Sequence, residues 1–234
     1  MAGPFVVAML GRQTRLRLDS ARLSLTIAAM PQPVIDAASR RYSVVAIVLH
    51  WTIAALVLVN IVIGLKASTL KGLALFDLLQ WHKSFGITVL VLSLTRLAWR
   101  LVNPPPPYPA HMAPWEKVAA AATHWGFYVL IIGLPLTGWI VVSASPLNIP
   151  TLLFKTIPWP FIGAVHTLPM AQRQGLESLM GGVHATLAWM AIVLIVLHVG
   201  AALKHQVWNR DVVLWRMAPL RGLRSGRAQG EEIP

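Results

Sequence analysis

The 234-residue sequence contains no cysteine and few charged residues. Without cysteine the chain cannot form a disulfide, a thiolate-held iron–sulfur cluster, a covalent c-type haem attachment or a cysteine zinc site. Charged residues make up 12% of the chain, against roughly 25% in a soluble domain. Acidic residues are the scarcest, 8 against 20 Lys and Arg. A metal or redox cofactor must therefore be held by His, Met or the few carboxylates.

Apolar residues dominate what is present: 56% of the chain is hydrophobic, and its mean hydropathy is +0.63. Four runs, at 44–65, 84–101, 118–142 and 183–203, approach or exceed the roughly 20 helical residues that cross a hydrocarbon core. The formal charge of +12 could also indicate nucleic-acid binding, which needs a basic face on a folded domain. Here the basic residues flank the apolar runs instead. We therefore predict an all-α integral membrane four-helix bundle.

Basic residues also predict the orientation of the bundle. With the N-terminus inside, fifteen Lys and Arg belong to inner segments and five to outer ones. The five outer residues are Lys66, Lys71, Lys83, Lys155 and Arg173. This asymmetry follows the positive-inside rule, so we expect both termini to be cytoplasmic.

Two connections between the spans are distinctive. The stretch NPPPPYP at 103–109 cannot be helical and indicates a stiff polyproline-type connector. The connection at 143–182 is the longest, and Phe154, Ile157, Trp159 and Phe161 make it apolar. We expect it to lie on the membrane surface or to cap the bundle.

The ends of the chain lie outside the four-span domain, which we place at 41–219. Residues 1–40 form a basic N-terminal arm that we expect to be disordered or to lie on the membrane surface. The apolar stretch at 5–10 is too short to span, and no convincing cleavage pattern follows. Met30 is an alternative start, and without the preceding residues the charge count still favours the same topology, eleven against five. Residues 220–234 form a C-terminal tail.

Five histidines lie in or at the ends of the spans, where ionisable residues are costly and usually functional. They are His50, His82, His124, His184 and His198. Any one alone is best explained as a hydrogen-bonding residue, but their arrangement favours another interpretation. His184 and His198 are fourteen residues apart, about 40° short of four helical turns, so both project from one face roughly 21 Å apart.

Alternating helix directions then pair these histidines by depth. His50, early in the first span, reaches the inner depth of His198, while His82, at the start of the second, reaches the outer depth of His184. Two stacked pairs in an apolar bundle suit two bis-histidyl haems, each taking one imidazole from either side. Zinc or copper would need three or four ligands at one depth.

His124 and His205 leave the inner site open to alternatives. Either could be the inner ligand in place of a paired histidine, contact a haem propionate, accept a quinol proton or lie at the interface. Cationic side chains near the two surfaces could hold the propionates: Arg41, Arg96 and Arg100 inside, and Lys83 outside.

Several motifs resemble the bacterial cytochrome b561 family. They include RYS at 41–43 before His50-Trp51, HKSFG at 82–86, LPLTG at 134–138, GVH at 182–184 before Leu197-His198, and WRMAP at 215–219. The proline-rich connector after Arg100 also matches. The resemblance covers 41–219 and implies that four axial ligands come from the first, second and fourth helices, here His50, His82, His184 and His198.

The resemblance implies a dihaem b-type cytochrome of a bacterial inner membrane. It would pass electrons between a quinone pool and a donor or acceptor at the outer face. The family includes a superoxide oxidase that reduces ubiquinone, so superoxide is a candidate donor and ubiquinone a candidate acceptor. His82 and Lys83 would give a local positive field that attracts such an anion to the outer face.

Two other functions remain open. The chain could be the cytochrome b anchor subunit of a larger respiratory oxidoreductase of the hydrogenase or formate dehydrogenase type, receiving electrons from a docked partner subunit. It could also be a non-redox transporter or scaffold with hydrogen-bonded histidines, which predicts a colourless preparation.

Overall fold

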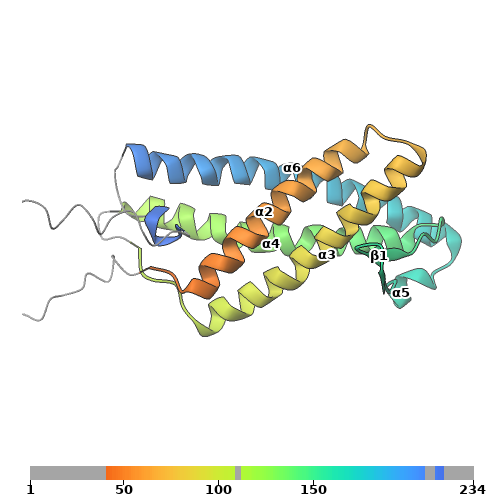
Figure 1. Ribbon diagram of the computed structural model, residues 1–234, viewed down its shortest axis with the longest axis horizontal. Coiled ribbons are helices and arrows are strands. Elements are labelled where there is room, and N and C mark those ends of the chain that lie inside the picture. Colours follow the sequence, from red (N-terminus) through yellow and green to blue (C-terminus); the bar gives the residue numbers. More distant parts are fainter. Residues whose placement is uncertain (1–40, 109–111, 209–213, 219–234) are drawn as a thin grey trace, which may run out of the picture. The chain divides into compact units, whose positions relative to one another are not determined.

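The computed structural model describes residues 41–108, 112–208 and 214–218. Four long helices alternate in direction (Figure 1): α2 (Val44–Ala67), α3 (Gly72–Val102), α4 (Pro114–Ala144) and α6 (Met170–Val207). Each is long and apolar enough to cross a membrane, which confirms the predicted all-α bundle of four membrane helices. The predicted N-terminal arm at 1–40 and the C-terminal tail at 220–234 lie outside the described residues.

Local sequence signals explain where the helices begin and end. The Ser43 hydroxyl caps α2 by accepting the Ala46 N–H at 3.3 Å, as serine commonly does at this position. A short turn then leads to α3, and Gly72 takes φ +63 there, a conformation that glycine adopts without steric cost. The α4 helix begins at Pro114, where the missing proline N–H leaves no helical bond unmade.

Two predicted boundaries were wrong by about three turns. Helix α3 begins at Gly72 rather than at 84, and α6 begins at Met170 rather than at 183. Hydropathy locates the part of a helix that lies in hydrocarbon, but a helix can continue beyond it through turns that also carry polar side chains. As a result His82 lies ten residues inside α3, not at its start.

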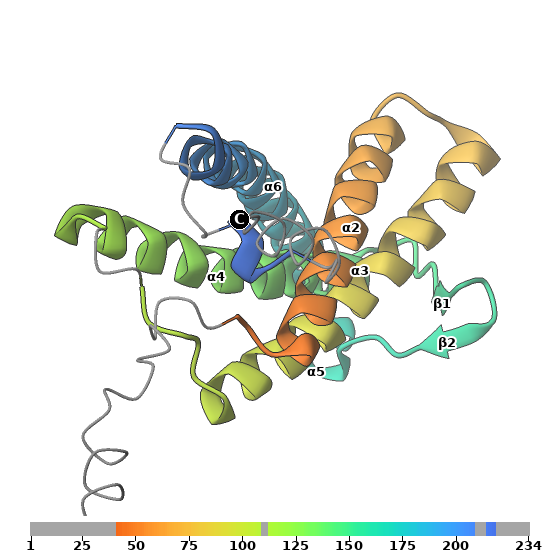
Figure 2. The same cartoon turned by 60° about the vertical axis from the view of Figure 1, so that its left-hand side comes forward.

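The long connection contains a hairpin that the sequence analysis did not predict. Strands β1 (Thr151–Leu153) and β2 (Ile157–Trp159) pair antiparallel, and the short helix α5 (Gly163–His166) follows. Figure 2 shows the hairpin beside α3. Two buried polar side chains on α3 hold it there: Gln80 exchanges hydrogen bonds of 3.0 and 3.1 Å with the backbone at 150 and 152, and Ser84 accepts the Phe154 N–H at 2.8 Å.

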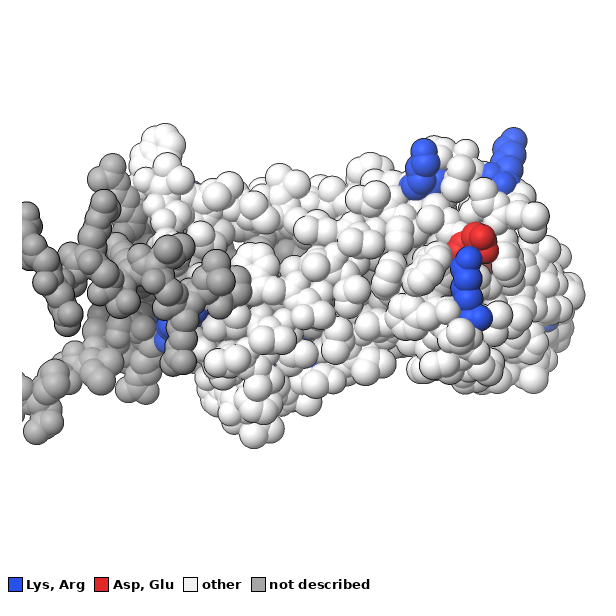
Figure 3. Space-filling view, in the orientation of Figure 1, with Lys and Arg blue, Asp and Glu red and all other residues white. Residues whose placement is uncertain are grey.

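The four helices contact one another in sequence order. Helix α2 packs on α3, α3 on α4, and α4 on α6, whereas α6 makes few close backbone approaches to α2 or α3. Large apolar side chains such as Val62, Val129 and Val196 are more than half exposed, as expected where lipid replaces water as the solvent. In Figure 3 the middle of the visible face is mostly uncharged.

One end of the bundle carries Arg41, Arg96, Arg100 and Arg216, and we call it the inner end, following the predicted topology. The segment at 214–218, which includes the short helix η2 (Leu214–Arg216), is hydrogen-bonded to this inner end. The indole of Trp51 donates to the Met217 carbonyl at 2.7 Å, and Arg216 donates to the Pro107 carbonyl at 2.8 Å. We call the opposite end, with the α2–α3 turn and the hairpin, the outer end.

Candidate functional site

Two histidine rings meet near the outer end, one from α3 and one from α6. The ring centres of His82 and His184 are 6.1 Å apart, with an angle of 76° between the ring planes. These residues come from helices whose backbones make few close approaches. Their side chains therefore bridge a part of the bundle where the helices themselves do not pack.

A second pair of rings meets near the inner end. His50 on α2 and His198 on α6 have ring centres 6.4 Å apart, again with 76° between the planes. Unlike the outer pair, this one has a third imidazole beside it. His124 on α4 has its ring centre 5.9 Å from that of His198, and Phe127 lies against the same ring at 5.2 Å.

The separation of both pairs fits two imidazoles on one metal ion. A metal–imidazole bond is about 2 Å long, and the ring centre lies about 1 Å behind the nitrogen, so two axial rings should be centred about 6 Å apart. Both pairs, at 6.1 and 6.4 Å, match that spacing. The described ranges contain no cluster of three or more His, Cys, Asp or Glu residues placed to hold a metal ion. Two imidazoles that face each other are the donor set of haem iron, whereas zinc and copper usually take three or four ligands.

Hydrogen bonds fix the tautomer of His184. Its Nδ1 lies 3.0 Å from the Leu134 carbonyl and 3.1 Å from the Thr137 hydroxyl. A carbonyl can only accept, so Nδ1 carries the proton and the Nε2 lone pair is available to a metal. The Nδ1 of His82, in contrast, is buried with no hydrogen-bond partner.

Glycines on the neighbouring helices make room for both outer rings. A Cβ added at Gly64 on α2 would lie 3.0 Å from Cε1 of His82, and one at Gly138 on α4 would lie 3.3 Å from Cε1 of His184. Both distances are shorter than ordinary van der Waals contact. The two outer imidazoles are thus each packed against bare backbone. None of the glycines in the described residues has an inner histidine among the nearest neighbours of an added Cβ.

Charged side chains, rather than glycines in close contact, surround the inner pair. Nη1 of Arg96 on α3 lies 2.8 Å from Nδ1 of His50. Because a guanidinium only donates, this nitrogen of His50 accepts, and the ring proton lies on Nε2. His50 therefore has the opposite tautomer to His184. The guanidinium of Arg100 lies over the rings of Trp125 and Tyr128 at 5.6 and 5.8 Å.

The remaining candidates from the sequence lie at different places. Lys83 donates to the Pro150 carbonyl at 3.2 Å, so it belongs to the outer end and contacts the long connection. His205 is buried near the end of α6 and also makes contacts there. The sequence analysis overlooked Thr137 and Gly138 as site residues although both lie in the LPLTG motif. It had no signal for Gly64, which lies inside an apolar run.

These features define a class: a membrane helical bundle with paired imidazoles at two depths, the donor set of a b-type cytochrome. Comparison with known proteins identifies the family. The family model described as prokaryotic cytochrome b561 matches residues 41–219. The chain therefore belongs to the prokaryotic cytochrome b561 family, a family of haem-binding membrane cytochromes.

Individual relatives agree with the family match over most of their length. Cytochrome b561 homolog 2 of Escherichia coli K12 is 31% identical over 185 residues, 76% of this chain and 90% of the relative. A probable superoxide oxidase, CybB, of Yersinia pestis is 32% identical over 186 residues, 77% and 97% of the two chains. Cytochrome b561 homolog 1 of E. coli K12 is 29% identical over 189 residues, 77% and 98%. The chain is accordingly a multi-pass protein of the bacterial inner membrane.

Proposed function

We propose that the chain binds two b haems, one between His50 and His198 and one between His82 and His184. Through them it would carry electrons between the quinone pool and a donor or acceptor at the outer face. The observation that supports this best is the common spacing of the two ring pairs, 6.1 and 6.4 Å. His184 and His198 lie fourteen residues apart on α6, roughly 21 Å along the helix axis, so the pairs span much of the bilayer.

The haem iron supplies one-electron exchange between its ferric and ferrous states. The residues of the chain do the rest. The outer imidazoles are held in position by Gly64, Gly138 and the Leu134 carbonyl. At the inner end, a haem held by Nε2 of His50 would need the ring proton on Nδ1, and Arg96 would then no longer donate to that nitrogen. The apolar spans around both pairs would limit the access of water to them.

A haem titration tests the ligand assignment. The experiment is a reduced-minus-oxidised visible spectrum with pyridine-haemochrome quantitation on the wild type and on four variants. These are His50→Ala, His82→Ala, His184→Ala and His198→Ala. We expect about two haems per chain in the wild type, since each pair binds one, and loss of one in each variant.

His166→Ala is the matched control, because His166 stacks on Phe161 at the outer end, in α5, and is in neither pair. It should keep both haems. A colourless wild type would refute the redox function. Haem retained in His50→Ala and lost in His124→Ala would keep the function but assign the inner site to His124 and His198.

Superoxide is the donor that we propose at the outer face, since a relative similar over most of this chain is named a probable superoxide oxidase. Two superoxide ions would release two dioxygen molecules and two electrons, which with two protons reduce one quinone to quinol. Lys83, next to His82 and half-buried, would attract the anion. Lys83→Glu should slow superoxide consumption about tenfold at low salt through lost electrostatic steering.

Lys71→Glu makes the same change of charge at the α2–α3 turn, away from the pair, and should have a smaller effect. Equal rates in both variants would count against a role for Lys83. The anchor-subunit alternative predicts instead that the chain is purified with an iron–sulfur partner and consumes no superoxide by itself.

A further inference from the structure

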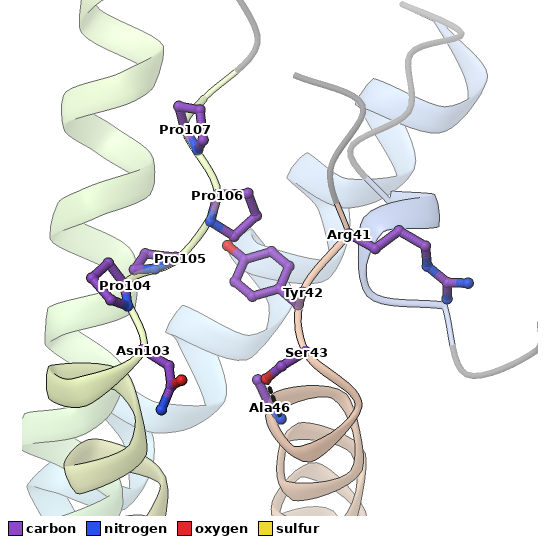
Figure 4. A pocket seen from close by; sticks show the side chains of 9 residues that line it. All are labelled: Arg41, Tyr42, Ser43, Ala46, Asn103, Pro104, Pro105, Pro106 and Pro107. Carbon is purple, nitrogen blue, oxygen red and sulfur yellow. Dashed lines mark hydrogen bonds between the residues drawn. The ribbon is translucent and has the colours of Figure 1, made fainter. Parts of the chain in front are cut away.

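A cavity of about 250 Å³ lies at the inner end, between the start of α2 and the connector that follows α3 (Figure 4). Its walls come from residues 41–43 and Ala46 on one side and from residues 103–107 on the other. The cavity is smaller than the 300–1,000 Å³ of sites that hold a whole drug-sized molecule. It suits the single ring of a head group.

The walls of this cavity combine proline rings with polar groups, and two of these groups can both donate and accept hydrogen bonds to a ligand. Four prolines at 104–107 form one side. The Ser43 oxygen already accepts from the Ala46 N–H and the Trp99 indole, so this hydroxyl has only its hydrogen left to donate. The Asn103 carboxamide donates one hydrogen to the Trp99 carbonyl, which leaves its second hydrogen and its oxygen.

The second polar group is the phenol of Tyr42. Figure 4 shows its ring reaching from the start of α2 toward the prolines. Burial raises the pKa of this phenol, although the nearby Arg216 and Arg100 act in the opposite direction. The hydroxyl is therefore protonated at neutral pH and can donate a hydrogen bond.

Charge distinguishes the kinds of head group that could enter. The side chain of Arg41 turns away from the prolines in Figure 4, and it donates to the Ala218 carbonyl. The groups left facing the cavity are thus a phenol, a carboxamide, the Ser43 hydroxyl and proline rings, which are all neutral. They suit a planar neutral ring with carbonyl or hydroxyl groups better than a phosphate, which favours arginine.

The rim of the cavity suits an apolar tail. Val44 at the start of α2 is 71% exposed, and Leu101 and Val102 at the end of α3 are 69% and 80% exposed. On a membrane protein such side chains face lipid. A ligand with its ring in the cavity could therefore extend a hydrocarbon chain along this rim into the bilayer.

We propose that this cavity binds the head group of a quinone, with the Tyr42 hydroxyl donating to one carbonyl and the Asn103 amide placed to contact the ring substituents. The inference rests on the proposed exchange of electrons with the quinone pool, and it assigns that exchange to the inner end. Ser43 precedes His50 by seven residues on α2, roughly 10 Å of helix. Arg96 relates the cavity to the inner histidine pair, because it contacts His50 and is close enough to Tyr42 to act on the pKa of its phenol.

Binding of ubiquinone-1 to the full-length, haem-loaded protein in detergent tests the proposal, by titration calorimetry and by cross-linking with an azido-ubiquinone. Tyr42→Phe should raise the Kd about tenfold, the effect of one lost hydrogen bond. Ala46→Phe should fill the cavity and abolish binding, and Asn103→Leu should weaken it without adding bulk to the helix contact. Tyr108→Phe, the same chemical change on the same connector but outside the cavity, should bind as the wild type does. Cross-links should map to 42–46 or 103–107.

The haem spectrum of each sample separates this inference from the proposed function. Two haems with an unchanged Kd in Tyr42→Phe and Ala46→Phe, or cross-links at the outer end, would overturn the cavity assignment and leave the function intact. Native mass spectrometry showing a phospholipid that Ala46→Phe displaces, with quinone binding unchanged, would overturn it as well. A wild type that has both haems but binds no ubiquinone-1 would overturn this inference together with the quinone part of the function.

Discussion

The outer and inner histidine pairs have nearly the same spacing but very different neighbours. The rings of His82 and His184 are packed against Gly64 and Gly138, and His184 donates to a backbone carbonyl. The rings of His50 and His198 have a third imidazole and a guanidinium beside them. Outer ring positions are thus set by steric contact, whereas inner ones are set by polar side chains. Variants that add volume should therefore weaken haem binding at the outer pair. Variants that remove charge should shift the midpoint potential of the haem at the inner pair.

The largest effect should come from Gly64→Ala. Its new methyl group would lie 3.0 Å from the His82 ring, and overpacking of this kind costs about 1–3 kcal/mol. We expect haem binding at the outer pair to weaken about tenfold or more, with the inner haem retained. The measurement is haem content per chain together with the spectrum of the remaining haem.

Gly86→Ala is the matched control for Gly64→Ala. An added Cβ there would meet Asn60 Nδ2 at 3.7 Å, an ordinary contact, so both haems should remain. Equal haem loss in the two variants would show that helix contacts in general, and not the His82 ring, are sensitive to added volume.

Gly138→Ala should weaken the outer haem less than Gly64→Ala does. The added methyl would lie 3.3 Å from the His184 ring, so a small shift relieves the contact, at a cost of about 1 kcal/mol or less. We expect up to about fivefold weaker binding, measured by haem titration of the apoprotein. A loss as large as that in Gly64→Ala would mean that His184 cannot move.

Arg96→Gln should lower the midpoint potential of the inner haem and leave that of the outer haem unchanged. Removing a positive charge next to His50 stabilises the oxidised haem, which carries more positive charge than the reduced form, so the inner midpoint potential should fall. An effect on the order of 1 kcal/mol corresponds to about 40 mV for a one-electron couple. Spectroelectrochemical titration resolves the two midpoints. Equal shifts at both haems would contradict the assignment of Arg96 to the inner site.

Thr137→Val should have the smallest effect. The hydroxyl lies 3.1 Å from Nδ1 of His184, but the Leu134 carbonyl accepts from the same nitrogen and is not removed. Losing one of two acceptors lowers the basicity of the imidazole, so the outer midpoint should rise slightly, by about 0.5 kcal/mol or about 20 mV. Loss of the outer haem in this variant would show that Thr137, rather than the carbonyl, holds the ring.

The number of helices and their order could be predicted from the sequence because hydrocarbon selects long apolar runs. Helix ends were harder to predict: α6 begins with polar turns that contain Arg173, and the first turns of α3 interrupt their leucines with Asp77 and Gln80. The side chains of Gln80 and Arg173 are buried because they bind backbone carbonyls of the long connection. The hairpin could not be predicted because the polar side chains that hold it lie about 70 residues away in the sequence.

The sequence also indicated which histidines to compare. Helix direction and spacing relate His50 to His198 and His82 to His184 by depth, and the structure places each of these pairs of rings close together. Their role as haem ligands stays a prediction. Depth alone could not show whether His50 or His124 is the inner ligand, because residues on different helices can lie at the same depth.

The sequence by itself determined the membrane class of the protein, the number of its spans and the separation of His184 and His198 along one helix, since these depend on hydrophobic length and helical rise along one segment. Only the tertiary structure decided which rings face each other, that Gly64 and Gly138 lie against the outer imidazoles, and that Tyr42 and the prolines enclose a cavity. Those contacts depend on how each helix is rotated about its axis toward the next. That rotation is set by side chains far apart in the sequence, which no local pattern describes.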